Sequence, residues 1–179
     1  MNIRRVLVPL DYSACSMGVV RQASGLAQKL GAQVTLLHVA ELPPGVTTAT
    51  PVHPHGADAS VGEVLQRDAD AHLLRVVAAV RADGVDCLAL VRFGAVVRVI
   101  LGTADELGVD LIVLGTHGRT GLARLVLGSV AESVAREANV PVMLVRRQPG
   151  LACAQVNCAW CGVDGRSAVE DRIAAETEG

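Results

Sequence analysis

The sequence predicts a doubly wound α/β fold, in which helices cover both faces of a five-stranded parallel sheet. Three observations support this prediction. Short apolar, β-branched runs alternate with segments of helical periodicity, the fourth run is apolar along its whole length, and 179 residues suffice for one hydrophobic core. The repeated strand–helix order favours parallel strands joined by right-handed crossovers.

The start of the chain predicts one strand, one helix and a second strand. RRVLVPL, at residues 4–10, is a short β-branched run, and apolar residues then recur at helical intervals through 13–30. Gly31 ends this helix, because glycine is favoured just after the last helical turn. QVTLLHV, at 33–39, is typical of a second strand.

A long connection separates the second strand from the next helix. Residues 41–60 are rich in Pro, Gly and Thr, which predicts a loop, and the helix after it is expected from about Ser60 to Ala82. VDCLALVRF, at 85–93, is the third expected strand, and a helix is expected at 94–108.

The last two strands surround the most unusual segment of the chain. VDLIVLG, at 109–115, is the fourth expected strand, a helix is expected at 129–139, and VPVMLVRR, at 140–147, completes the sheet. Doubly wound sheets bind ligands beyond the carboxyl ends of strands whose connections leave to opposite faces. The loops after the first and fourth strands are therefore the candidate site.

The composition excludes several classes of protein. The chain is 51% hydrophobic and 19% charged, with a net charge of −2 and one residue each of Tyr, Phe and Trp. It lacks the basic stripe and the aromatic platforms of nucleic-acid binders, and no apolar run approaches the roughly 18 residues of a membrane span. We expect no nucleic-acid or membrane partner. The short apolar run near the start is no signal-peptide core, which favours a cytoplasmic location.

The segment from Gly115 to Gly128, GTHGRTGLARLVLG, is longer than the usual strand–helix connection of about 2 to 6 residues. Its glycines can bring backbone N–H groups close to a ligand, and Arg119 adds a cation. Ser129 is expected at the N-cap of the next helix, where the helix dipole favours a phosphate. Ser129 and Glu132 also match a capping box, so a purely structural role stays open.

The spacing G-x2-G-x9-G-S, formed by Gly115, Gly118, Gly128 and Ser129, closely resembles the universal stress protein family in its ATP-binding branch. The opening VLVPLDYS and the LLHV of the second strand belong to the same resemblance, which covers roughly residues 3–147. It implies the strand order 3-2-1-4-5 and an adenine nucleotide, ATP or AMP, at the switch between the first and fourth strands. It also implies that Mg2+ or Mn2+ binds at the phosphates in those members that bind a metal. It further implies homodimers in which two chains pair through their fifth strands.

The resemblance also implies individual roles. Asp11 lies near the ribose, Pro9 shapes the turn beside it, and the backbone of Val39 contacts the adenine edge. The phosphates are held by Gly115, Gly118, Gly128, Ser129 and the amide of Val130. The chemistry of Asp11 agrees, because a carboxylate at a strand end can accept hydrogen bonds from ribose hydroxyls, although Asp is also a common turn former. We expect the adenine between aliphatic side chains such as Val39 and Val113.

Strong catalysis is not expected. Lys29, the only lysine, lies in the first expected helix, which excludes a P-loop NTPase. His117 is interpreted as a polar loop residue, because no nucleophile or metal cluster accompanies it, and a role as a general base or phosphate contact stays open. The resemblance thus implies a stress-response regulatory protein that binds an adenine nucleotide, and whose nucleotide occupancy tunes a protein partner or its own conformation. A weak ATPase or autokinase stays open as an alternative.

We divide the chain into a nucleotide-binding domain at 1–148 and an extension at 149–179 that lies outside the resemblance. The extension contains three cysteines in a C-x4-C-x2-C pattern: Cys153, Cys158 and Cys161. Such thiols can bind a metal or cycle as a dithiol, so a thiol or metal sensor is a further alternative to a loosely ordered extension. Cys87 is interpreted as a small packed residue.

Overall fold

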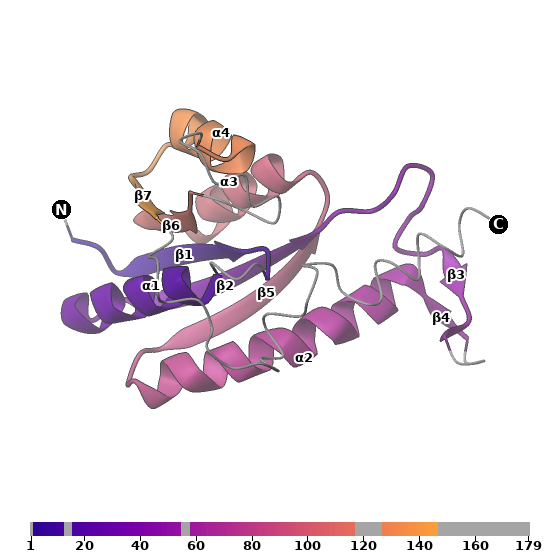
Figure 1. Cartoon of the computed structure of the whole chain (residues 1–179), viewed down its shortest axis with the longest axis horizontal. Coiled ribbons are helices and arrows are strands. Elements are labelled where there is room, and N and C mark those ends of the chain that lie inside the picture. The colour runs from indigo at the N-terminus through magenta and orange to yellow at the C-terminus, as the bar shows by residue number, and fades with distance from the viewer. Residues whose placement is uncertain (1, 13–15, 55–57, 117–126, 147–179) are drawn as a thin grey trace.

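The computed structural model describes residues 2–12, 16–54, 58–116 and 127–146 (Figure 1). One parallel sheet contains β1 (Arg5–Leu10), β2 (Gln33–Ala40), β5 (Cys87–Phe93), β6 (Leu111–Gly115) and β7 (Val142–Val145). The spatial order of these strands is β5-β2-β1-β6-β7. Counted along the chain within this sheet, that is the order 3-2-1-4-5, so the predicted fold class and strand order are confirmed.

Helices cover both faces of the sheet. Those in the described part of the chain are α1 (Ser16–Leu30), α2 (Val61–Ala82), α3 (Val96–Leu107) and α4 (Ser129–Glu137). In Figure 1, α3 and α4 lie above the sheet, and α1 and α2 lie below it. None of the described helices combines the length and the apolar character needed to cross a lipid bilayer.

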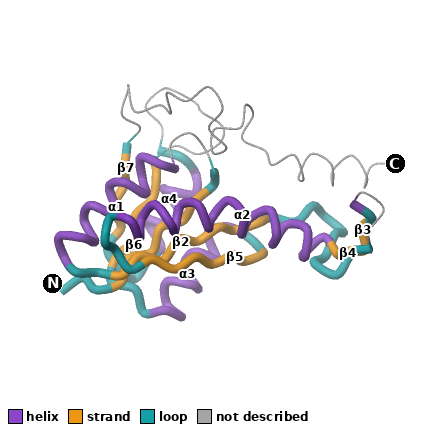
Figure 2. Tube along the Cα trace, turned by 90° about the horizontal axis from the view of Figure 1, so that it is seen from below, coloured by secondary structure: helices purple, strands orange, loops and turns teal. Residues whose placement is uncertain are grey.

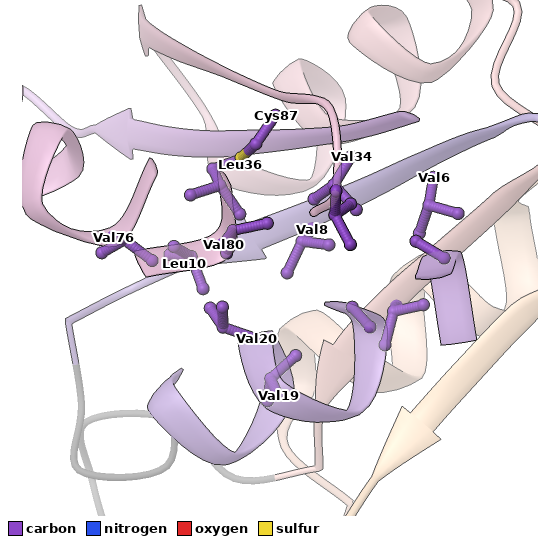
Figure 3. Close-up of a cluster of buried hydrophobic side chains, with 14 of the residues drawn as sticks. Val6, Val8, Leu10, Val19, Val20, Val34, Leu36, Val76, Val80 and Cys87 are labelled. Carbon is purple, nitrogen blue, oxygen red and sulfur yellow. The ribbon is translucent and has the colours of Figure 1, made fainter. Parts of the chain in front are cut away.

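The sheet separates two apolar clusters. In the first, side chains of β1 and β2 such as Val8 and Leu36 face Val20 of α1 and Val80 of α2 (Figure 3). In the second, side chains of the opposite sheet face pack against α3 and α4. This alternation follows from the strand geometry, in which successive side chains point to opposite faces.

The two clusters locate the switch point of the sheet. Helix α1, which follows β1, contributes to the first cluster, whereas α4, which follows β6, contributes to the second. Because β1 and β6 are neighbours, their connections leave to opposite faces at this place. The predicted switch between the first and fourth strands of the sheet is therefore confirmed.

The predicted loop at 41–60 also contains a short antiparallel hairpin, which the sequence did not indicate. Its strands are β3 (Pro51–Val52) and β4 (Ala59–Ser60), and it lies at the end of α2 that projects beyond the sheet (Figures 1 and 2). Gly62 of α2 donates its amide hydrogen to the Thr48 carbonyl at 2.9 Å. A Cβ atom on residue 62 would lie 2.9 Å from Thr48, so this contact requires glycine.

A carboxylate joins the amino ends of β1 and β6. The side chain of Asp110 accepts hydrogen bonds from the backbone N–H groups of Arg4 (2.8 Å) and Arg5 (2.9 Å). Arg5 in turn donates to the Leu107 carbonyl at the end of α3 (2.7 Å). The two backbone donors, first Arg4 and then Arg5, lower the pKa of the Asp110 carboxyl.

Replacing Asp110 by Ala is expected to destabilise the fold at neutral pH and to have less effect in acid. A carboxyl whose pKa is lower in the folded state stabilises that state above its unfolded pKa, and this stabilisation is lost as the pH falls through the folded pKa. Urea unfolding of parent and variant at pH 7 and below about pH 4 measures the difference. A difference in unfolding free energy that is independent of pH would contradict this role, and Asp58→Ala, in the hairpin, serves as the exposed control.

Cys87 is a packed residue, as expected, with its side chain fully buried at the start of β5. Burial raises the pKa of its thiol to about 11, although Arg81 nearby opposes the shift. At pH 8 the thiol is therefore almost entirely protonated, and the reactive thiolate is scarce. We expect native protein to leave Cys87 unmodified by iodoacetamide and unfolded protein to modify it. Peptide mass spectrometry measures both, and rapid native labelling would contradict the burial.

Candidate functional site

Strands β1 and β6 pair over only part of their length. The β1–β2 ladder runs from Arg5↔Gln33 to Leu10↔His38, whereas the β1–β6 ladder ends at Leu7↔Ile112. The two strands that flank the switch point are therefore joined at their amino ends and not along their carboxyl halves. Ligands of doubly wound sheets bind beyond the carboxyl ends at this place.

Pro9 explains why this ladder stops. The Arg5 carbonyl accepts a hydrogen bond from the Asp110 amide (2.9 Å), so the backbone groups of Arg5 face β6. Backbone groups of successive residues point to opposite edges of a strand, so Leu7 and Pro9 face β6 as well. Proline carries no N–H and cannot donate the next bond of the ladder.

The groups opposite Pro9 belong to Val113 and Gly115. The Ile112 amide donates to the Pro141 carbonyl (3.0 Å), just before β7, so the backbone of Ile112 faces β7. By the same alternation, the backbone groups of Val113 and Gly115 face β1. The amide of Gly115, a predicted phosphate ligand, therefore faces the edge of β1 beyond the last paired residues.

Asp11 follows β1 directly, and a hydrogen bond fixes its side chain. The hydroxyl of Ser16 donates to Oδ1 of Asp11 at 2.9 Å. Ser16 is the first residue of α1 and is almost fully buried. The carboxylate that the resemblance assigns to the ribose is thus held at the carboxyl end of β1.

The two ends of the glycine segment meet. The amide of Gly128 donates to the Thr116 carbonyl at 2.9 Å, and the amide of Thr116 donates to the Val145 carbonyl at 3.0 Å. These bonds bring the start of α4 to the carboxyl end of β6. Gly115, Gly128, Ser129 and Val130 therefore lie at one edge of the sheet, whereas Gly118, Arg119 and His117 lie outside the described residues.

The predicted N-cap of α4 is wrong by one residue. Gly128 occupies the cap position, with φ of −61° and ψ of 144°, and Ser129 is the first helical residue. From that position its hydroxyl does not form the capping bond, so the predicted capping box with Glu132 is not formed either. Among the described residues no side chain caps this end of α4, whose first amides point out of the helix.

The predicted adenine environment is partly corrected. The Ala40 carbonyl accepts a hydrogen bond from the amide of Gly94 (3.1 Å), next to β5, so the backbone groups of Ala40 face β5. Those of the preceding residue, Val39, therefore face the opposite neighbour, β1. The side chain of Val113, however, is fully buried in the first cluster, while Val39 packs against the second. These two side chains lie on opposite faces of the sheet and do not enclose a base.

Three rings gather beside Asp11, which the sequence did not indicate. The ring of Tyr12 stacks on His38, with centroids 4.1 Å apart, and lies 5.2 Å from the ring of His72. Tyr12 lies just after β1, His38 lies in β2 and His72 lies in α2. The adjacency of Tyr12 to Asp11 was the only local signal, because contacts between distant elements depend on the strand register.

Among the described residues, no group of three or more His, Cys, Asp or Glu side chains lies close enough together to hold a metal ion. His53 pairs with Asp58 at 3.2 Å, and both side chains are exposed. The predicted metal ligands of the extension, Cys153, Cys158 and Cys161, lie outside the described residues.

The model of the universal stress protein family matches residues 2–146 of the chain. The chain belongs to the universal stress protein family. Universal stress protein MJ0531 of Methanocaldococcus jannaschii is 30% identical over 144 residues, which cover 80% of this chain and 82% of that protein. Universal stress protein G of Escherichia coli O157:H7 is 34% identical over 146 residues, which cover 80% of this chain and 99% of that protein.

Solved universal stress proteins share the fold. MJ0577 of M. jannaschii matches with a TM-score of 0.68 at 23% identity, over 83% of this chain and 99% of that one. A universal stress protein in complex with cAMP matches with a TM-score of 0.56 at 24% identity, over 81% and 98%. The universal stress protein from Archaeoglobus fulgidus in complex with dAMP matches with a TM-score of 0.52 at 22% identity, over 80% and 98%.

Proposed function

We propose that this universal stress protein binds an adenine nucleotide, ATP or AMP, at the carboxyl ends of β1 and β6, and that nucleotide occupancy regulates a protein partner. The observation that carries the proposal is the position of two chemically different groups on the two strands of the switch point. The carboxylate of Asp11 directly follows β1, and the start of α4 is hydrogen-bonded to Thr116, which directly follows β6.

Each end of this site suits one part of a nucleotide. The amides of Gly115, Gly128, Ser129 and Val130 lie where a strand end meets a helix N-terminus, which favours phosphate oxygens. Among the described residues no side chain caps the start of α4, and phosphate oxygens are suited to accept hydrogen bonds from its first amides. Asp11 accepts hydrogen bonds from the ribose hydroxyls, and the backbone of Val39 contacts the adenine edge.

The two solved relatives in complex with adenine nucleotides support the choice of base. They carry cAMP and dAMP on the same fold. Both ligands combine an adenine, a sugar and one phosphate, and a site with a carboxylate at one strand end and helix amides at the other matches that order. The proposed ligand therefore lies across the switch point, with its phosphates toward α4.

Replacing Asp11 by Ala is expected to weaken ATP binding about tenfold, because a hydrogen bond to a charged acceptor is lost. Isothermal titration calorimetry on the purified full chain measures the dissociation constant. Asp58→Ala, an exposed carboxylate in the hairpin, is the matched control and should bind as the parent does. A parent protein that binds neither ATP nor AMP would refute the proposal.

A further inference from the structure

Tyr12 adopts a backbone conformation that its side chain disfavours. Among the described residues it is the single non-glycine residue with a positive φ, at 57°. In this left-handed region the Cβ atom crowds the following carbonyl, so such residues persist only where their surroundings hold them, frequently at ligand sites. Tyr12 directly follows Asp11, and its conformation sets the direction of the chain at the carboxylate.

Contacts from two other elements hold Tyr12 in place. Its ring stacks on His38 of β2 with an interplanar angle of 27°, and the ring of His72 lies beside it. His38 is itself fixed, because its Nδ1 donates to the Leu10 carbonyl (3.0 Å) at the end of β1. The Tyr12 hydroxyl also makes a long contact to the Ala69 carbonyl, at 3.4 Å. The stacking of the ring on His38 therefore restrains Tyr12 against β2.

A second restraint acts on the carboxylate itself. Ser16 donates to Oδ1 of Asp11 at 2.9 Å from a buried position at the start of α1. Tyr12 thus restrains the backbone next to Asp11, while Ser16 restrains its side chain. We propose that Tyr12 and Ser16 are positioning residues, which aim the Asp11 carboxylate at the ribose hydroxyls of the bound nucleotide. This inference rests on the proposed function.

The test compares two ligands on each variant. One is ATP, and the other is 2′,3′-dideoxy-ATP, which lacks both ribose hydroxyls. The ratio of their dissociation constants isolates the contribution of the hydroxyls, because contacts to adenine and phosphate are common to both ligands and cancel. A general loosening of the site would change both constants and leave this ratio unchanged.

The parent is expected to prefer ATP by about tenfold, and Asp11→Ala should bring the ratio close to one. Ser16→Ala removes the restraint on the carboxylate and should lower the ratio at least about threefold. Tyr12→Gly should lower it similarly, because glycine adopts the same φ without strain but lacks the ring. Tyr12→Phe keeps the ring and should retain the parent ratio.

Controls and double variants complete the test. Ser24→Ala removes another buried hydroxyl of α1, two turns further along, and should leave the ratio unchanged. Adding Ser16→Ala to Asp11→Ala should have no further effect on the ratio. An unchanged ratio in both Ser16→Ala and Tyr12→Gly would overturn the inference while leaving the proposed function intact. A parent that does not bind ATP would overturn both.

Discussion

Replacing Gly128 by Val is expected to weaken ATP binding by at least about a hundredfold while the protein stays folded. The loss corresponds to about two hydrogen bonds between backbone amides and charged phosphate oxygens. Gly128 has φ of −61° and ψ of 144°, an extended conformation that valine readily adopts, so the backbone is not strained by the substitution. The new side chain instead occupies the space at the start of α4 that the phosphates need.

Calorimetric titration with ATP and thermal unfolding of the same samples separate binding from folding. The matched control is Gly102→Val, in the middle of α3, where a Cβ atom meets nothing within 4 Å. It should change neither the affinity nor the unfolding temperature appreciably, because valine is no worse than glycine within a helix. Parent-like ATP affinity in Gly128→Val would show that the phosphates are not held at the start of α4.

The fold could be predicted because its signals are local. Apolar runs and helical periodicity placed the main strands and helices, with ends that differ by a few residues, as for the expected helix at 94–108, observed as Val96–Leu107. The hairpin was not predicted, because its strands, Pro51–Val52 and Ala59–Ser60, are too short to show the alternation of apolar and polar residues that marks a strand. Its position depends on contacts to α2, such as that of Gly62 with Thr48.

The positions of the candidate site's groups could be predicted only where these groups follow strand ends. Asp11 directly follows an apolar run, and Gly115 ends one. The structure brings both residues to the switch point. The face of the sheet to which the Val113 side chain points depends on the register of β6 against its neighbouring strands. The N-cap of α4 depended on whether Gly128 or Ser129 adopts the extended conformation, since both residue types are common at helix caps. The stacking of Tyr12 on His38 depends on the pairing of β1 with β2.

Replacing Pro9 by Val is expected to weaken ATP binding at least about thirtyfold, with little change in stability. Valine restores an N–H on the edge of β1 that faces β6, opposite the backbone of Val113. The ladder that ends at Leu7↔Ile112 can then continue toward the carboxyl ends of the strands, at the spacing of about 4.8 Å between paired strands. The amide of Gly115 would then face a paired strand and no longer a ligand.

The stability of this variant reflects two opposing effects. The new backbone hydrogen bond contributes about 1 kcal/mol, and the loss of proline makes the unfolded chain more flexible at a similar cost. Hydrogen exchange therefore provides the direct measurement, because the amide of residue 9 should be protected only if the ladder extends. Pro51→Val, in β3 of the hairpin, is the matched control and should retain parent-like ATP affinity. Full ATP affinity together with a protected amide at residue 9 would show that the nucleotide does not need unpaired carboxyl ends of β1 and β6.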